Sequence, residues 1–282
     1  MAARRIALTA DDFGLSEAVN EGIERAHREG ALSHASLMVA GAAAADAVRR
    51  ARRLPDLRVG LHLVAVEGPA VLPPADIPAL VDARGWFPSD QMRLGLRYFF
   101  LPHVRRQLAA EIRAQFAAFA ATGLALDHAD AHKHMHLHPT VGRLLLRIGR
   151  DFGLPRIRVP TEPPGVMRAC GTRPGPGAHA LHAWSRVLRR QAHAAGVATD
   201  AAVFGIAWSG HMTAPRVLRL LATLPDADCE LYFHPAARRD ALLAALMADY
   251  QPEAELSALL DPAVRQALAR MGRPLRRERK SS

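Results

Sequence analysis

The chain opens with Arg5-Ile6-Ala7-Leu8-Thr9-Ala10-Asp11-Asp12-Phe13-Gly14, an apolar, strand-like run that passes into two adjacent acids. Ser16 follows and is a residue type that caps helices, and Val19, Ile23 and Ala26 then recur at helical spacing. A short apolar strand followed by an amphipathic helix is the repeating unit of parallel-sheet α/β proteins. This opening stretch therefore predicts an α/β fold.

The same unit recurs along the chain. Seven short apolar runs are predicted to be strands: Arg5–Thr9, Ala35–Val39, Arg58–Leu63, Ala125–Ala129, Arg156–Val159, Val203–Ala207 and Glu230–Phe233. We predict one domain over residues 1–272, a distorted, incomplete (β/α) TIM-like barrel with about seven parallel strands. The Pro- and Gly-rich stretches 64–90 and 161–177 are expected to be functional loops.

Composition restricts the class of partner. Half of the 282 residues are hydrophobic, 23% are charged and the formal net charge is +10. Most of the excess Arg is scattered through helical runs, no nucleic-acid-binding motif accompanies it, and aromatic residues make up only 5%. We therefore predict no nucleic-acid partner. The basic run Arg273–Lys280 predicts a mobile tail, residues 273–282, that can contact anionic lipid headgroups.

The location of the protein is predicted from what the sequence lacks. Cys170 and Cys229 form neither a paired-cysteine metal motif nor a disulfide framework. The first residues contain no apolar core of a signal peptide, and the most apolar stretch, residues 35–45, is too short to span a bilayer. We expect a cytoplasmic protein whose only membrane contact is peripheral, at the inner face of the cytoplasmic membrane.

Polar residues follow two of the predicted strands. Asp11 and Asp12 are adjacent carboxylates, which repel unless a cation or proton offsets the repulsion, so the pair favours a metal or acid–base site. His62 lies at the C-terminal end of the third predicted strand, where parallel sheets and barrels gather catalytic groups. A turn-forming Asp and a structural His are the ordinary alternatives.

A histidine-rich block reads Asp127-His128-Ala129-Asp130-Ala131-His132-Lys133-His134-Met135-His136-Leu137-His138-Pro139. Alternate residues of an extended chain share a face, so His132, His134, His136 and His138 are predicted to converge. Imidazoles are common ligands of zinc and similar metals, and nearby aspartates can orient them. Spacing alone leaves open which histidine binds, and a nonspecific His-rich tract stays the alternative.

The last predicted strand ends in His234, and Pro235 prevents the strand from continuing. Parallel topology brings the ends of the strands that precede Asp11/Asp12, His62, His132 and His234 to one rim. An Asp-His-His set with open positions for water and substrate is the arrangement of catalytic rather than structural metal sites.

Four motifs then occur in order between residues 9 and 236: Thr9-Ala10-Asp11-Asp12-Phe13-Gly14-Leu15-Ser16, Gly60-Leu61-His62-Leu63, the histidine-rich block, and Phe233-His234-Pro235-Ala236. Together they resemble the YdjC-like carbohydrate deacetylases, and in particular the branch associated with hopanoid biosynthesis. The resemblance implies a distorted (β/α) barrel that hydrolyses the acetamide of sugars with one divalent metal ion, zinc first, with magnesium, cobalt or nickel as alternatives.

The resemblance also implies roles for individual residues. It gives Asp12, His62 and His132 as metal ligands, Asp11 as the base and His234 as the group near the departing amine. Residues expected to bind substrate or to support these groups are Asp130, His134, His136, Arg158 and His211. Lys133 stands where members of the family often have His, which favours His132, directly before it, as the ligand.

The implied substrate is an N-acetylglucosaminyl group on a hopanoid lipid, and the segment Met92–Pro102, which mixes Arg with aromatic and aliphatic residues, would suit a lid or an interfacial contact. Soluble chito-oligosaccharides or other acetylated sugars are the alternative substrates. The non-enzyme alternative is a His-rich metal-binding protein. The oligomeric state is left open.

Overall fold

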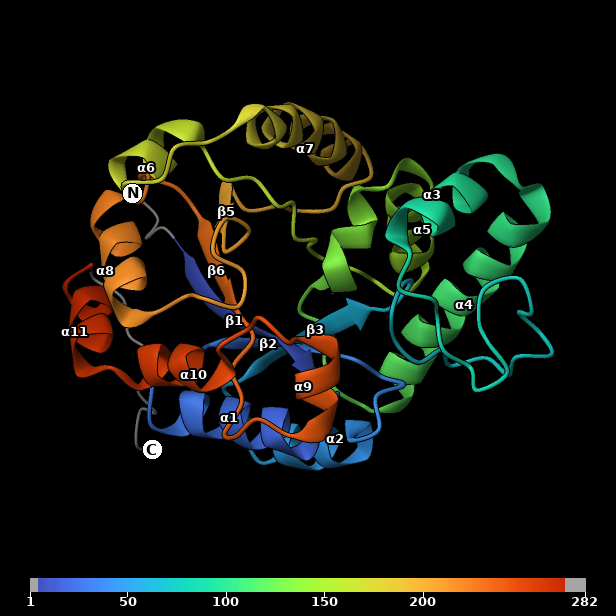
Figure 1. Ribbon diagram of the computed structural model, residues 1–282, viewed down its shortest axis with the longest axis horizontal. Coiled ribbons are helices and arrows are strands. Elements are labelled where there is room, and N and C mark those ends of the chain that lie inside the picture. The colour runs from blue at the N-terminus through green and yellow to red at the C-terminus, as the bar shows by residue number, and fades with distance from the viewer. Residues whose placement is uncertain (1–4, 272–282) are drawn as a thin grey trace.

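The computed structural model describes residues 5–271 and contains one curled sheet of six parallel strands in the order β4-β3-β2-β1-β6-β5 (Figure 1). The strands are β1 Ile6–Phe13, β2 His34–Leu37, β3 Arg58–Leu63, β4 Ala129–Ala131, β5 Ala202–Phe204 and β6 Cys229–Phe233. The sheet curls into a half-barrel, and the α/β class predicted from the sequence is confirmed.

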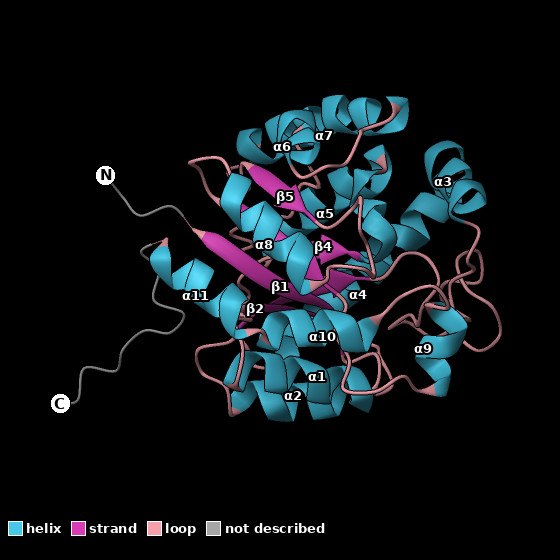
Figure 2. Cartoon of the chain, turned by 60° about the vertical axis from the view of Figure 1, so that its left-hand side comes forward, coloured by secondary structure: helices cyan, strands magenta, loops and turns pink. Residues whose placement is uncertain are grey.

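Helices cover the outer face of the sheet (Figures 1 and 2). The helices of the described residues are α1 Glu17–Arg28, α2 Ala44–Arg52, α3 Gln91–Phe100, α4 Pro102–Ala121, α5 Pro139–Asp151, α6 Pro164–Ala169, α7 Pro176–Ala194, α8 Ala214–Thr223, α9 Ala241–Leu246, α10 Pro252–Leu260 and α11 Pro262–Arg270. Of these, α3 packs on α4 and α5, and the end of α9 lies at the C-terminal ends of the strands. In α1 the Ser16 hydroxyl accepts the amide of Val19, and Ile23 and Ala26 are buried against the sheet, as their spacing predicts.

The fifth of the seven predicted strands, Arg156–Val159, does not form a regular ladder. It makes two isolated parallel bridges, Ala129↔Ile157 and Arg156↔Ala198. Pro155 and Pro160 bracket the segment, and each removes a backbone donor and restricts its neighbour. Residues 155–161 nevertheless hydrogen-bond to β4 on one side and to residues 198 and 203 on the other, so they lie along the open edge of the half-barrel.

The inner face of the sheet is polar. Side chains alternate between the two faces of a strand, so Asp11 of β1, Ser36 of β2, His62 of β3 and Glu230 of β6 all face inward, whereas Leu8, Ala10 and Leu231 belong to the apolar layer beneath the helices. Contacts among the inward side chains confirm this arrangement, because Ser36 bonds Asp130 and Arg158 bonds both Asp11 and Glu230. The functional groups predicted from the sequence therefore share one interior.

The two long loops are more ordered than their composition indicates. Residues 64–90 are tied to α4, since Glu111 accepts the amides of Val71 and Leu72 and Gln115 bonds the backbone of Val64 in both directions. Residues 161–177 contain the short helix α6, which Pro164 begins. The predicted basic tail 273–282 lies outside the described residues. Between residues 5 and 271 no helix is long and apolar enough to cross a membrane.

Gly60 of β3 yields a test of the interior packing. A Cβ at this position would lie 2.6 Å from three atoms of the His128 ring, which packs directly on the strand. We expect Gly60→Ala to lower the free energy of unfolding by about 1–3 kcal/mol, because the overpacked ring must move. Urea denaturation measures the change.

Gly165→Ala is the matched control, because a Cβ on this exposed residue of α6 meets nothing within 4 Å. We expect this control to keep or slightly raise stability, since Ala favours the helix. Equal stability of Gly60→Ala and the wild type would contradict the packing described for His128.

Candidate active site

The three predicted metal ligands come together at the C-terminal ends of the strands. Asp12 Oδ1 lies 3.3 Å from His62 Nε2 and 3.2 Å from His132 Nδ1. One ligand atom from each residue lies within 4.8 Å of the others, and all three residues are buried. They come from β1, from β3 and from the residue after β4, so folding of the sheet assembles the cluster.

Asp12 is the most unusual member of this cluster. It lies in β1, one residue before the strand ends, and not in the loop that the paired acids predict; its φ is +63° at an irregularity in the pairing with β2. Aspartate tolerates this left-handed conformation better than most residues do. Apart from the His62 and His132 rings, neither Asp12 oxygen has a polar partner among residues 5–271, although the side chain is buried. A buried carboxylate whose polar neighbours are two imidazoles fits a cation.

The electrostatics of the cluster agree with this fit. Burial alone would raise the pKa of Asp12, but contacts with His132 and His62 outweigh burial and hold that pKa well below its usual range. For His62 burial lowers the pKa, yet the Asp130 charge and the contact with Asp12 raise it well above the ordinary value. The carboxylates are thus kept ionised where a metal would need them.

Asp130 orients His62. Its Oδ1 lies 2.7 Å from His62 Nδ1, while its Oδ2 accepts from the Ser36 hydroxyl at 2.7 Å and lies 2.8 Å from Arg158 Nη2. Ser36 in turn lies 3.0 Å from His128 Nε2. Since His62 uses Nδ1 for Asp130, its Nε2 is turned toward Asp12 and is the atom available to a metal.

Asp11 is held by Arg158. Arg158 Nη1 and Nη2 donate to the two Asp11 oxygens at 2.6 and 2.7 Å, and Asp11 lines a pocket of about 200 Å³. Asp11, His62 and Asp130 also satisfy the spacing of a metal trio. However, both oxygens of Asp11 and of Asp130 already accept from other side chains, which leaves Asp12 as the carboxylate with open positions.

The histidine-rich block does not continue as an extended strand, and only part of the predicted convergence is found: the His134 and His136 rings lie 5.9 Å apart, whereas His138 is the N-cap of α5. Residues His132–Leu137 form a 3₁₀ segment, η1, in which Lys133 and His134 have φ of +50° and +54°. His134 Nε2 lies 2.9 Å from the Tyr232 hydroxyl, and His138 caps α5. His136 is buried, and burial lowers its pKa to about 4.

Backbone strain is concentrated here. In residues 5–271 the non-glycine residues with positive φ are Asp12, Glu67, Lys133 and His134, and the last three line the pocket. Lys133 forms an ion pair with Glu67 at the pocket wall and is not part of the Asp12 cluster. Strained residues persist where surrounding contacts over-determine them, most often at functional sites.

His234 lines the same pocket from the end of β6. Its ring packs against Tyr232 and Tyr250, its Nδ1 lies 3.9 Å from Glu255, and this nitrogen has no hydrogen-bond partner among the residues described. His211, expected near the substrate, does not line the pocket; its Nδ1 faces the backbone oxygen of Ser209.

Sequence reasoning missed several residues of the pocket, namely Glu67, Ser209, Met247 and Tyr250. These residues lie in loops, where the sequence has no helical or strand periodicity that could predict which side chains reach the pocket. Tyr232 was also missed, although a signal existed: Glu230, Tyr232 and His234 alternate along β6 and must share its inner face.

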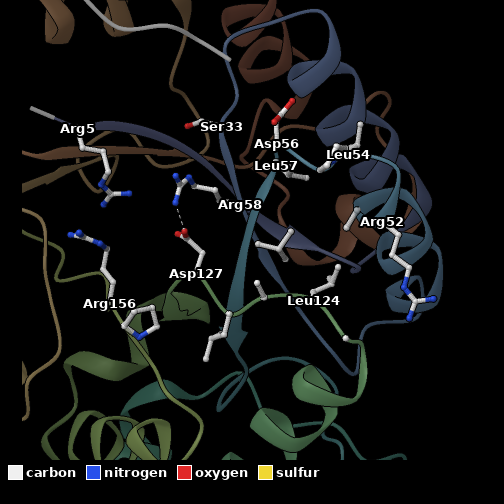
Figure 3. Close-up of a pocket in the computed structure, with 17 residues that line it drawn as sticks. Arg5, Ser33, Arg52, Leu54, Asp56, Leu57, Arg58, Leu124, Asp127 and Arg156 are labelled. Atoms are coloured by element: carbon white, nitrogen blue, oxygen red, sulfur yellow. Dashed lines mark hydrogen bonds and ion pairs between the residues drawn. The ribbon is translucent and has the colours of Figure 1, made fainter. Parts of the chain in front are cut away.

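A larger cavity, of about 910 Å³, opens at the N-terminal ends of the strands (Figure 3). Three of its arginines form ion pairs with acids: Arg58 with Asp127, and Arg5 and Arg156 with Asp200. Groups that would act on a substrate gather at the opposite end in α/β barrels. We therefore assign the candidate active site to the smaller pocket.

Comparison with known proteins agrees with this geometry. Residues 5–270 match the family described as YdjC-like protein. The chain belongs to the YdjC-like family. The match covers every element that supplies the Asp12, His62 and His132 cluster and His234.

Individual relatives of this YdjC-like chain are similar over part of its length. A carbohydrate deacetylase from Brevibacillus brevis is 38% identical over 156 residues, which are 55% of this chain and 59% of that protein. A carbohydrate deacetylase from Geobacillus stearothermophilus is 37% identical over 158 residues, 56% of this chain and 60% of that protein. The chain thus matches less than two thirds of the length of these curated relatives.

The fold has a close counterpart among solved structures. The crystal structure of a protein from Enterococcus faecalis V583, named for cellobiose-phosphate cleavage, superposes with a TM-score of 0.74 over 96% of both chains at 22% identity. This similarity supports the fold of the YdjC-like chain.

Replacing the unpaired carboxylate tests the metal cluster. We expect Asp12→Asn to weaken zinc binding at least about 100-fold, because removing a direct ligand costs no less than removing an outer partner. Competition with a chelating dye measures the affinity, and the rise in melting temperature on adding zinc gives a second readout.

His103→Asn is the control for this test, since it removes an exposed histidine of α4. This control should keep the zinc-induced rise in full. The same rise in Asp12→Asn and the wild type would show that zinc binds elsewhere.

Proposed function

We propose that this chain is a divalent-metal-dependent hydrolase that removes the acetyl group from an N-acetylated amino sugar. The observation that carries the proposal is the buried Asp12, whose oxygens have no polar partner other than His62 and His132, which lie beside it at the wall of a pocket. Membership of the YdjC-like family and the names of its deacetylase relatives support it.

Asp12, His62 and His132 would hold the metal. Two imidazoles and a carboxylate suit zinc, and they also accept magnesium, cobalt or nickel. When bound, the metal would supply Lewis-acid polarisation of the acetyl carbonyl. Asp130, Ser36 and His128 fix the orientation of the His62 ring before any ligand arrives.

Asp11 is the proposed general base. Each Asp11 oxygen accepts one hydrogen bond from Arg158 and retains another lone pair. The carboxylate is therefore fixed in orientation and can still accept a proton from the water that attacks the acetyl carbonyl. Because Arg158 is itself buried and bonded to Glu230, Asp11 cannot rotate away without breaking these contacts.

His234 is the proposed proton donor to the departing amine. An amide nitrogen is a poor leaving group until it gains a proton. The imidazole lines the pocket between Tyr232 and Tyr250, and its Nδ1 is uncommitted within the described chain. These contacts limit the ring to a narrow range of orientations.

For the substrate we propose an N-acetylglucosaminyl group on a hopanoid lipid, acted on at the inner face of the cytoplasmic membrane. The sequence motifs that resemble the hopanoid-associated branch support this choice. So does a second cavity of about 300 Å³, whose mainly apolar lining includes Met167, Leu181 and Ile206. Ile206 precedes Ser209 of the active-site pocket by three residues, so an apolar group attached to the sugar has a place nearby. Soluble chito-oligosaccharides are the alternative.

Acetate release tests the activity. We expect Asp11→Asn and His132→Ala, checked for folding by circular dichroism, to lose about 10²–10⁴-fold in kcat/KM, because each removes a group that acts on the reacting atoms. Chelation should abolish wild-type activity and zinc should restore it, whereas His103→Asn should keep the wild-type rate.

Wild-type rates in both site variants would contradict the assignment. Mass spectrometry of acetylated sugar lipids and of chito-oligosaccharides, before and after incubation with the zinc-loaded protein, decides the substrate class. Zinc uptake in several equivalents without acetate release would favour a His-rich metal-binding protein instead.

A further inference from the structure

The large apolar side chains that stay exposed in residues 5–271 are confined to two helices. They are Met92, Leu96, Phe99 and Phe100 of α3, Leu101 directly after it, and Trp184 and Val187 of α7. We call this set the α3–α7 patch. Single exposed apolar residues are common on proteins, but their confinement to one region marks an interaction surface.

Helix α3 is apolar on two faces. Leu94 and Tyr98 point inward, and the Tyr98 hydroxyl donates to the backbone oxygen of Ala65. Met92, Leu96 and Phe100 repeat every four residues on the outer side, with exposed fractions of 79%, 56% and 65%. A surface helix normally presents polar residues outward. The outer stripe is therefore not explained by packing within this chain.

Both helices contact residues at the end of the 3₁₀ segment η1. The Phe99 ring lies 6.3 Å from the ring of His138, and Trp184 Nε1 donates to the backbone oxygen of Leu137 at 2.8 Å. Figures 1 and 2 both place α3 and α7 on the same side of the molecule, with α5 close to both. Their exposed side chains therefore belong to one region of the surface.

Along α3 and α7 themselves the charged side chains have one sign, although Asp90 caps the start of α3. Residues 91–110 and 163–199 contain no Asp or Glu, while Arg93 and Arg97 lie on α3 and Arg186 and Arg190 on α7. A symmetric contact between two copies would bring these arginines together. An anionic bilayer can bind both the apolar side chains of the patch and the arginines beside them. Its acyl chains accept the apolar side chains, and its headgroups accept the arginines. Trp184 is of the residue type enriched at such interfaces.

We propose that the α3–α7 patch docks this protein onto an anionic lipid bilayer. The patch begins at the wall of the active-site pocket, because Gln91, the first residue of α3, donates to the backbone oxygen of Lys133. Docking would therefore bring the pocket to the membrane surface. The docking proposal is argued only from the exposed side chains of the α3–α7 patch. The idea that docking delivers a lipid-linked sugar to the pocket rests on the proposed function.

Vesicle sedimentation tests the docking with the full chain. The vesicles contain phosphatidylcholine alone or phosphatidylcholine mixed with phosphatidylglycerol. We expect the wild type to sediment with the mixed vesicles, to a degree that falls with salt, and to stay free of the neutral ones. The double variant Leu96→Glu, Phe100→Glu should bind the mixed vesicles about tenfold less, because it places acids where headgroups and acyl chains would lie.

The matched control is Ala42→Glu, Ala45→Glu. It makes the same change in net charge at exposed residues at the start of α2, on the opposite side of the molecule from α7 in Figure 1. This control should sediment like the wild type. Both variants should keep the wild-type melting temperature and the wild-type rate on a soluble N-acetylated sugar, which separates failed docking from failed catalysis.

Three outcomes would overturn the proposal. The first is a wild type that ignores phosphatidylglycerol. The second is undiminished binding of the Leu96→Glu, Phe100→Glu variant, which would place the contact elsewhere in the chain. The third is a wild-type dimer in analytical ultracentrifugation that this variant dissociates while vesicle binding is absent, which would make the patch a contact between copies.

Discussion

The guanidinium of Arg158 is the group on which the interior of this half-barrel depends. It is almost fully buried and lies within 3.0 Å of oxygens of Asp11, Asp130 and Glu230, which belong to β1, β4 and β6. One cation thus joins strands from the centre and from both halves of the sheet. Removing such a partner would leave three buried carboxylates uncompensated, a situation that proteins rarely tolerate.

Arg158 does not balance all of this charge. Four buried carboxylates surround this one guanidinium: Asp11, Asp12, Asp130 and Glu230. Arg158 contacts three of them and does not contact Asp12. Burial raises the cost of this excess negative charge, while His62 and His132 offset part of it at Asp12. A divalent cation at Asp12 would complete the compensation, so the same charge distribution that holds the strands together also suits the Asp12 cluster to a cation.

Much of this arrangement could be predicted from the sequence, because strand periodicity and strand ends are local properties. β3 begins and ends where its apolar run does, and the placement of Asp12, His62 and His132 at one rim follows from parallel topology. What could not be predicted depends on tertiary contacts. The left-handed backbone at Asp12 and His134 has no local signal, the η1 turn replaces the expected extension, and the link between Arg158 and Asp11 spans 147 residues.

The left-handed residues of the pocket have a consequence for engineering the protein. Glycine adopts positive φ without steric cost, whereas Glu67, Lys133 and His134 adopt it only because their side chains are held, Glu67 by Lys133 and His134 by Tyr232. Stabilisation that only relieves backbone strain would therefore tend to select glycine at these positions and to relax the pocket wall. Substitutions that raise thermal stability in this short segment would therefore make the pocket wall less well defined. Stabilising substitutions are better placed in the outer helices of the protein.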